Sequence, residues 1–153
     1  MKMNNSLKHT IYNECIRLLE ARISDYRIAM NAAQEAANSD DKSSAGDKYE
    51  TARAMGQLDR DMNAKQLVEA QSELQSIIKI DLDYISESAQ IGSLIETSNG
   101  IYFIAVGIGV LEIEKQKIIV LSPKSPLAKE MMSKKIGNQF LFNSKEFTVK
   151  NIS

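Results

Sequence analysis

Acidic residues gather between positions 40 and 50 of the chain: Asp40, Asp41 and Asp47, with Glu50 one helical turn later. The first 91 residues, which include this run, contain no proline. Adjacent carboxylates can bind Mg²⁺, but this hard cation usually takes more oxygen ligands than one loop supplies. The run therefore predicts either a metal site that a second macromolecule completes, or a solvated loop in which Asp47 caps the following helix.

Few other side chains could carry chemistry. The chain has one histidine, His9, and one cysteine, Cys15, which rules out a structural zinc site of four cysteines or of two cysteines and two histidines. Six positions separate the two residues, so we expect packed or exposed roles rather than a nucleophile pair. A lone cysteine cannot form an internal disulfide, which is typical of a protein of the reducing cytoplasm.

The composition is that of a soluble globular protein, with 43% hydrophobic and 25% charged residues among 153. Lys and Arg number 19 against 20 Asp and Glu, and this balance argues against a free-standing DNA binder, which needs a basic face. No apolar run reaches the roughly 18 residues of a membrane span, and the first residues lack the apolar core of a signal peptide. We expect neither a membrane protein nor a sequence-specific DNA binder.

Two long helices must position the acidic run. Residues 1–91 contain only two glycines, and an apolar seam with alternating steps of three and four predicts a helix over about 6–38. The seam residues are His9, Tyr12, Ile16, Leu19, Ile23, Tyr26, Met30, Ala33 and Ala37. A second apolar ridge predicts a helix over about 48–78. Its residues are Ala52, Met55, Leu58, Met62, Leu67, Ala70, Leu74 and Ile77.

A short polar loop, residues 39–47, joins the two predicted helices. Helices of about 30 residues joined in this way form an antiparallel coiled-coil hairpin on the order of 45 Å long. A small domain cannot bury the far end of such a hairpin. We therefore expect the acidic run to be exposed at its tip.

The second half of the chain holds most of the turn residues and favours β-strands. We expect strands at Ile91–Thr97, Ile101–Val106, Val110–Ile113, Lys117–Leu121, Gln139–Phe142 and Glu146–Ile152. Asn99-Gly100 predicts a hairpin turn, and Ser125-Pro126 predicts the start of a helix that continues to about Lys135. The sequence thus predicts an α+β protein, with the helical hairpin over residues 1–78 and a small antiparallel sheet with one helix over 79–153.

Five passages in this half carry a family pattern of hydrophobic, glycine and Ser-Pro positions. They are Ile91-Gly92-Ser93-Leu94-Ile95, Tyr102-Phe103-Ile104-Ala105-Val106-Gly107, Ile118-Ile119-Val120-Leu121-Ser122, Ser125-Pro126-Leu127-Ala128-Lys129 and Lys134-Lys135-Ile136-Gly137-Asn138. Together they resemble the bacterial Gre transcription elongation factors, which have a coiled-coil hairpin followed by an FKBP-like domain. The Ser-Pro-Leu-Ala-Lys passage is the most specific. In the first half, residues 47–53 resemble the start of the family's second hairpin helix more loosely.

The resemblance implies a partner and a mechanism. Gre factors bind RNA polymerase and thread the hairpin into its secondary channel, where the acidic tip stimulates the polymerase's own cleavage of backtracked nascent RNA. By this resemblance Asp41, with Asp40 and Asp47, assists catalysis at the RNA 3′ end, and Asp41 and Asp47 share the Mg²⁺ of the polymerase. The chain would then be a factor rather than an enzyme, with no cofactor of its own.

The resemblance also places RNA polymerase docking on the globular domain. The candidate docking residues are Ser125, Pro126, Leu127, Lys129 and Lys134. Lysines gathered around one helix could face an acidic partner surface, although such a cluster is usually a solvated face.

The tip departs from the family pattern, because Ser44 or Ala45 stands where the family has Glu. A serine hydroxyl cannot supply the missing negative charge, so the alternative is a cleavage-inactive regulator that still occupies the secondary channel. A prolyl isomerase or chaperone is a weaker alternative, because such sites need an aromatic-lined apolar pocket. A hairpin that assembles with itself is a further alternative. An exposed apolar stripe along both helices would favour it, but a single alternating seam on each helix argues against it.

Overall fold

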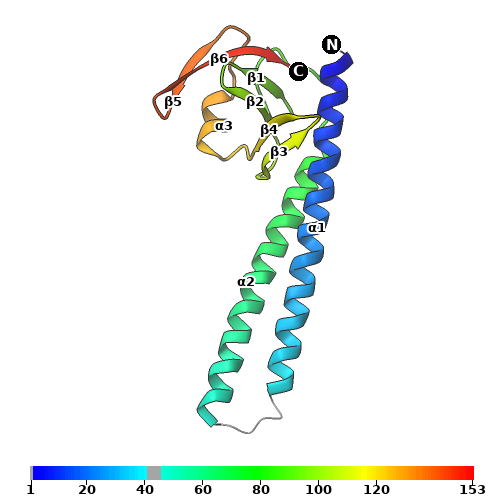
Figure 1. Ribbon diagram of the computed structural model, residues 1–153, viewed down its shortest axis with the longest axis vertical. Helices are drawn as coiled ribbons and strands as arrows, with labels where there is room; N and C mark the ends of the chain where they lie inside the picture. Colours follow the sequence, from blue (N-terminus) through cyan, green and yellow to red (C-terminus); the bar gives the residue numbers. More distant parts are fainter. Residues whose placement is uncertain (1, 41–45) are drawn as a thin grey trace. The chain divides into compact units, whose positions relative to one another are not determined.

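The computed structural model of the protein describes residues 2–40 and 46–153 (Figure 1). Two long helices come first, followed by six strands and one short helix. The elements are α1 (Lys2–Asp40), α2 (Gly46–Ile78), β1 (Leu94–Thr97), β2 (Gly100–Ile104), β3 (Gly109–Ile113), β4 (Gln116–Leu121), α3 (Pro126–Met131), β5 (Gln139–Phe142) and β6 (Lys145–Ile152). The predicted α+β class, a helical hairpin followed by a sheet with one helix, is confirmed.

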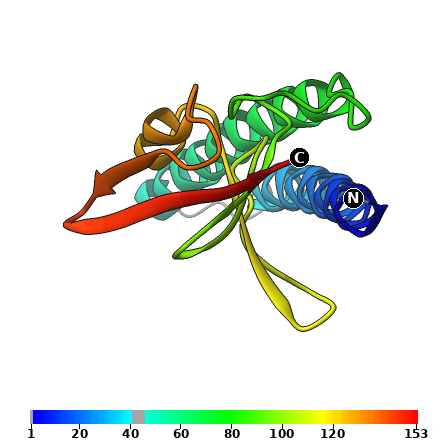
Figure 2. The same cartoon turned by 90° about the horizontal axis from the view of Figure 1, so that it is seen from above.

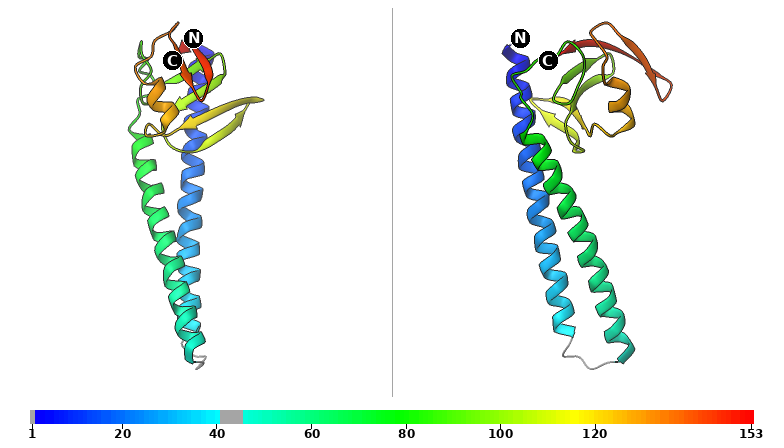
Figure 3. Two further views of the ribbon diagram at one scale, coloured as in Figure 1. Left: turned by 90° about the vertical axis from the view of Figure 1, so that its left-hand side faces the viewer. Right: turned by 180° about the vertical axis from the view of Figure 1, so that it is seen from behind.

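Within residues 18–74, the helices α1 and α2 run antiparallel and side by side, as Figures 1 and 3 show. They comprise 39 and 33 residues, and each extends about one turn or less beyond the predicted bounds. Since their described residues contain no proline, nothing in them removes a backbone donor from the helical hydrogen-bond ladder.

The predicted seam of α1 is buried only in part: Leu19 and Ile23 are buried, whereas Tyr12 and Ile16 are half-buried. Ile11, Cys15 and Leu19 are fully buried and Ile23 is nearly so, so the buried row advances in steps of four. His9, which the sequence placed in the seam, is exposed. Neighbouring apolar rows at i, i+3 and i+4 share one broad face of a helix, and the sequence pattern alone does not show which row is covered best.

The predicted apolar ridge of α2 is wrong for the first half of that helix. Ala70 and Ile77 are buried, but Met55, Leu58 and Met62 expose 58%, 60% and 62% of their surface. Helical spacing identifies a stripe of apolar residues, whereas burial requires that a partner cover it. That stripe is uncovered at the start of α2 in the described structure.

The chain divides into two compact units, and their bounds differ from the element order. One unit is residues 18–74, and the other joins residues 1–17 to residues 75–153. The first turns of α1 therefore belong with the sheet, and Leu7 lines a small pocket together with Leu94 and Ile101. The sequence could not show this grouping, because it depends on contacts between residues far apart in the chain.

The six strands form one sheet in the order β3-β4-β2-β1-β6-β5. Neighbouring strands are antiparallel except β2 and β4, which are parallel, with Ile101 opposite Ile118 and Ile104 opposite Leu121. The expected sheet of antiparallel strands is corrected at this pair. The chain reverses between β2 and β3, and the β3–β4 hairpin reverses it again, so β4 runs in the same direction as β2.

The core of the sheet domain lies between the sheet and α3, which Figures 1 and 2 show beside the β5–β6 hairpin. Ala128 and Met131 of α3 are fully buried in it. The rings of Phe140 and Phe147 stack with centroids 5.0 Å apart and an interplanar angle of 8°. This packing connects the short helix to the last two strands of the chain.

Two-residue turns close two of the hairpins. Glu114 and Lys115 have φ of 53° and 67°, and Asn143 and Ser144 have φ of 50° and 65°. Paired left-handed residues are typical of the turns that match the twist of adjacent strands. The last turn is thus one residue shorter than the predicted Asn143–Lys145, since Lys145 already belongs to β6.

Candidate functional site

The Ser-Pro passage forms the N-terminal cap of α3. Ser125 adopts an extended conformation, and its hydroxyl accepts a hydrogen bond from the backbone N–H of Ala128 while it donates one to the carbonyl of Ser122 at 2.8 Å. Pro126 occupies the first helical position, where its missing N–H costs nothing. The predicted helix start is confirmed, and the residue pair that identifies it serves to cap the helix.

The helix ends earlier than predicted, at Met131 rather than near Lys135. Met132 leaves helical geometry with ψ of 137°, and Ser133 has φ of +70°. The chain then pairs elsewhere, because Ser133 N–H donates to the carbonyl of Ala89 and Ala89 N–H donates to that of Lys134, both at 2.8 Å. Lys134 therefore lies in an extended segment beside residues 88–89 and not on the helix.

The five candidate docking residues differ in how far they are accessible. Pro126 and Lys129 are exposed, whereas Ser125 is half-buried with its hydroxyl engaged in the cap. Leu127 is half-buried and packs against the core. The Lys134 ammonium lies 5.8 Å from the centroid of the Phe140 ring, a cation–π contact that holds this positive charge close to β5.

The candidate tip carboxylates fall largely outside the described residues. Asp40 is the last residue of α1 and Asp47 the second of α2, but their side chains lie outside the description. So do Asp41, Ser44 and Ala45 in full. The assignment of catalytic and metal-binding roles to Asp40, Asp41 and Asp47 thus stays a prediction.

In the part of the chain that the structure describes, no group of three His, Cys, Asp or Glu side chains is arranged to hold a metal ion. Likewise, none of the described helices is long and apolar enough to cross a membrane.

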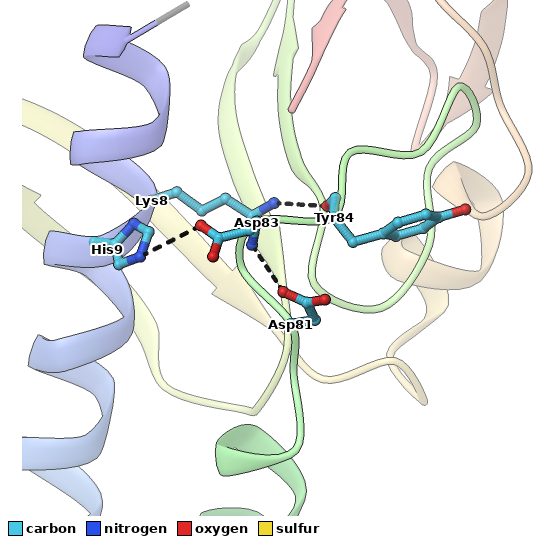
Figure 4. Close-up of polar contacts among 5 residues, drawn as sticks. All are labelled: Lys8, His9, Asp81, Asp83 and Tyr84. Carbon is cyan, nitrogen blue, oxygen red and sulfur yellow. Dashed lines mark hydrogen bonds and ion pairs between the residues drawn. The ribbon is translucent and has the colours of Figure 1, made fainter.

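A polar cluster joins the first turns of α1 to the segment between α2 and β1 (Figure 4). Lys8 is only 1% exposed, and its ammonium donates to the carbonyl of Tyr84 at 3.5 Å. Beside it, His9 Nε2 lies 3.9 Å from Asp83 Oδ1. The Asp81 carboxylate accepts a hydrogen bond from Asp83 N–H at 3.0 Å.

Burial lowers the pKa of Lys8, and the nearby carboxylates of Asp81 and Asp83 oppose that shift in part. The sequence interpretation missed this residue. A signal was available, because Lys8 lies three and seven positions before Ile11 and Cys15 and so shares their buried helical face. The cluster fastens the segment after α2 to the first turns of α1.

The single histidine and cysteine have the packed or exposed roles expected of them. His9 is exposed and faces Asp83, while Cys15 is fully buried. A reactive thiol needs access and a nearby positive charge that stabilises the thiolate. A thiol with no solvent exposure is not suited to nucleophilic chemistry.

The aromatic residues of the sheet domain bear on the isomerase hypothesis. Tyr102, Phe103, Phe140 and Phe147 are all 8% exposed or less, and three of them belong to the core cluster. A prolyl-isomerase site requires such rings around an open apolar pocket. These rings fill the interior instead, which does not support that hypothesis.

Comparison with known proteins gives similarity among solved structures only. No protein-family model matches the chain, and no curated protein is similar to it in sequence. Among solved structures, it is similar to one described as the structure of the transcription factor Gfh1. The two chains share 15% identity over 92% of each, with a TM-score of 0.34, a similarity too low to decide function.

Proposed function

We propose that this protein is a Gre-like transcription elongation factor. It binds RNA polymerase, inserts its helical hairpin into the secondary channel and stimulates cleavage of backtracked nascent RNA. The proposal rests on the resemblance of residues 90–152 to Gre factors. One structural observation supports it: a helical hairpin precedes a sheet domain, and the most specific passage of the resemblance, Ser125-Pro126, starts the helix of that domain.

In the proposed mechanism the chain contributes carboxylates and the polymerase contributes the catalytic centre. Mg²⁺ held between them would stabilise the attacking and leaving oxygens of an in-line phosphoryl displacement. Asp41, aided by Asp40 and Asp47, would supply negative charge to that ion and orient the attacking water. Because the polymerase provides the other ligands, a few tip carboxylates suffice. The protein would act in the cytoplasm, with no cofactor of its own and no sequence-specific contact with DNA.

A second candidate function keeps the docking and omits the cleavage. Ser44 and Ala45 stand where Gre factors carry Glu, and neither side chain can hold a cation by charge. In this case the protein is a regulator that occupies the secondary channel and changes pausing or initiation. The two candidates differ only in the chemistry of the tip.

A stalled elongation complex with labelled RNA tests both candidates. We expect the protein to release short 3′ fragments, and Asp41→Asn to reduce their rate by about 10-fold or more with little change in polymerase binding, because a charge used in the transition state affects rate rather than docking. Asp61→Asn is the matched control, since Asp61 is an exposed acid within α2. If the protein releases no fragments but competes with a cleavage factor for the polymerase, the regulator is the correct candidate.

The docking surface is tested in the full-length chain, because residues 1–17 belong to the same compact unit as the sheet. We expect Lys129→Glu to weaken co-purification of RNA polymerase, since it reverses an exposed charge at the proposed contact. Lys150→Glu reverses an exposed charge on β6 and serves as the control. Equal binding by both variants and the unchanged protein would remove Lys129 from the interface.

A further inference from the structure

The two edge strands of the sheet are β3 and β5, and β5 leaves backbone groups open along its outer side. The turn at Asn143 and Ser144 makes Phe142 and Lys145 the first ladder pair of the last hairpin. In a two-residue hairpin this pair exchanges both backbone hydrogen bonds, and the pairs alternate from there. Leu141, one residue earlier, therefore directs its N–H and C=O away from β6, and so does Gln139.

The side chain at the same position is apolar and open to solvent. Leu141 is 69% exposed, more than any other large hydrophobic residue of the described structure. Proteins usually protect an edge strand with lysine, proline, a bulge or a covering element, because free backbone groups pair readily with another strand. β5 is short, with four residues, yet its exposed leucine offers an added strand an apolar contact besides the backbone hydrogen bonds.

The charge around this edge is positive. The last 39 residues, 115–153, contain eight lysines and two glutamates, with no aspartate, arginine or histidine. The lysines are Lys115, Lys117, Lys124, Lys129, Lys134, Lys135, Lys145 and Lys150. Lys115 and Lys117 lie on the β3–β4 hairpin at the opposite edge of the sheet, so they do not contribute to the charge at β5. Lys134 lies over the Phe140 ring, and Lys145 of β6 is opposite Phe142 in the ladder, so both lie on the face of the sheet that carries Phe140 and Phe142. On the other face, Glu146 lies opposite Leu141.

We propose that the outer edge of β5 binds an extended, acidic segment of a partner protein by strand addition. The backbone of the added strand hydrogen-bonds to Gln139 and Leu141. Because side chains alternate along a strand, apolar residues of the segment pack on Leu141 while acidic residues face Lys134 and Lys145. This interaction is independent of the hairpin tip and goes beyond the function proposed above.

The opposite edge of the sheet shows why the charge matters. In β3, Val110 is 63% exposed and, by the same ladder rule, directs its backbone groups outward. Beside it the exposed charges are of both signs, Glu112 and Glu114 with Lys115 and Lys117, so an acidic segment finds no net positive charge there. Pairing of β5 with β5 of a second copy would bring two sets of lysines together, which disfavours a homodimer at this edge.

Peptide binding to the full-length protein tests the proposal. The probe is a fluorescein-labelled peptide of four Glu-Val repeats, compared by anisotropy with four Lys-Val repeats and with a Glu-Val peptide N-methylated at alternate residues. We expect only the unmethylated acidic peptide to bind, and Leu141→Pro to weaken it by about tenfold. Proline removes just the outward N–H and is tolerated on an edge strand. Val110→Pro makes the same change on β3, and we expect affinity within about twofold of the unchanged protein.

Several outcomes would overturn the proposal. Equal binding of the N-methylated peptide would show that backbone pairing is not involved, and equal binding of the lysine peptide would exclude charge selection. Loss of binding in the Val110 variant alone would assign the site to β3. A dimer that Leu141→Pro disrupts would make a second copy the occupant. If that variant fails to fold, hydrogen exchange of the Leu141 amide in the unchanged protein provides the test. Bound peptide should slow this exchange, and exchange that is equally fast with and without peptide would refute the contact.

Discussion

Three glycines with nearly equal backbone angles allow strain and steric clash to be measured separately. Gly92, Gly109 and Gly137 have φ of +93°, +95° and +92°. A Cβ atom added at Gly92 would lie 2.7 Å from Cγ2 of Ile80, whereas at Gly109 and Gly137 it would meet nothing within 4 Å. Replacement by alanine therefore imposes similar backbone strain at three sites and a side-chain clash at one.

The expected losses follow from these two terms. A non-glycine residue at positive φ costs about 1–2 kcal/mol, and the reduced freedom of the unfolded chain returns about 0.4–1 kcal/mol. Gly109→Ala and Gly137→Ala should each lower the free energy of unfolding by about 1 kcal/mol. Overpacking adds about 1–3 kcal/mol, so Gly92→Ala should lower it by about 2–4 kcal/mol.

Urea denaturation of the full-length variants, followed by circular dichroism, measures these differences. An unchanged dependence on urea concentration indicates that the loss is one of stability rather than a change in the unfolded state. Combining Gly92→Ala with Ile80→Ala removes the clashing methyl group. The double variant should then be more stable, by about 1–3 kcal/mol, than the sum of the two single losses predicts.

Two results would refute this reasoning. If Gly92→Ala loses no more stability than its two counterparts, Ile80 moves aside and the contact is not a constraint. If Gly109→Ala and Gly137→Ala cost nothing, positive φ imposes no strain at these turns. Gly92 also belongs to the first passage that resembles Gre factors, so the first outcome would remove steric demand as the reason for glycine there.

Other substitutions test the buried lysine, the apolar stripe and the tip. Because burial lowers the pKa of Lys8, the unfolded chain binds more protons just below pH 10.5, the usual lysine pKa, and stability should rise with pH there. Lys8→Met should remove that rise and increase the free energy of unfolding by about 1 kcal/mol at pH 7, as measured by urea titration across pH. Burial raises the pKa of Tyr102, so this residue makes stability fall with rising pH, both in the variant and in the unchanged protein. Met62→Lys should change the free energy of unfolding by less than about 0.5 kcal/mol in the same assay, because Met62 is exposed. A loss of about 2 kcal/mol would show instead that Met62 is packed, as the sequence predicted. Ser44→Glu should increase RNA 3′-fragment release if the missing acid limits cleavage, and an unchanged rate would show that it does not.

Local sequence patterns predicted most of the elements. The absence of proline before residue 92 and the apolar spacing predicted both long helices, and Ser125-Pro126 predicted the start of α3. These signals are local, since a cap, a turn or a missing N–H acts within a few residues. The same reason explains why all six strands were expected near their observed positions.

The errors concern contacts between distant parts of the chain. The helix at Pro126 was predicted to reach Lys135, but Ser133 and Lys134 pair with Ala89, about 45 residues earlier. The parallel pairing of β2 and β4 depends on where the chain turns back after β2. Neither partner is indicated by the residues of the segment itself, so local preference gave way to tertiary pairing.

The candidate sites divide in the same way. The sequence by itself determined which residues could carry chemistry: few nucleophiles, an acidic run at residues 40–50 and lysines gathered around the helix that Pro126 starts. Only the tertiary structure decided that Lys8 is buried, that Met62 is exposed, and that Leu141 lies on an edge strand whose Phe140 ring is covered by Lys134. Residue type and spacing specify which face of an element is apolar or charged. Whether that face is covered depends on elements distant in sequence, and burial, pKa and the availability of backbone groups all follow from that covering.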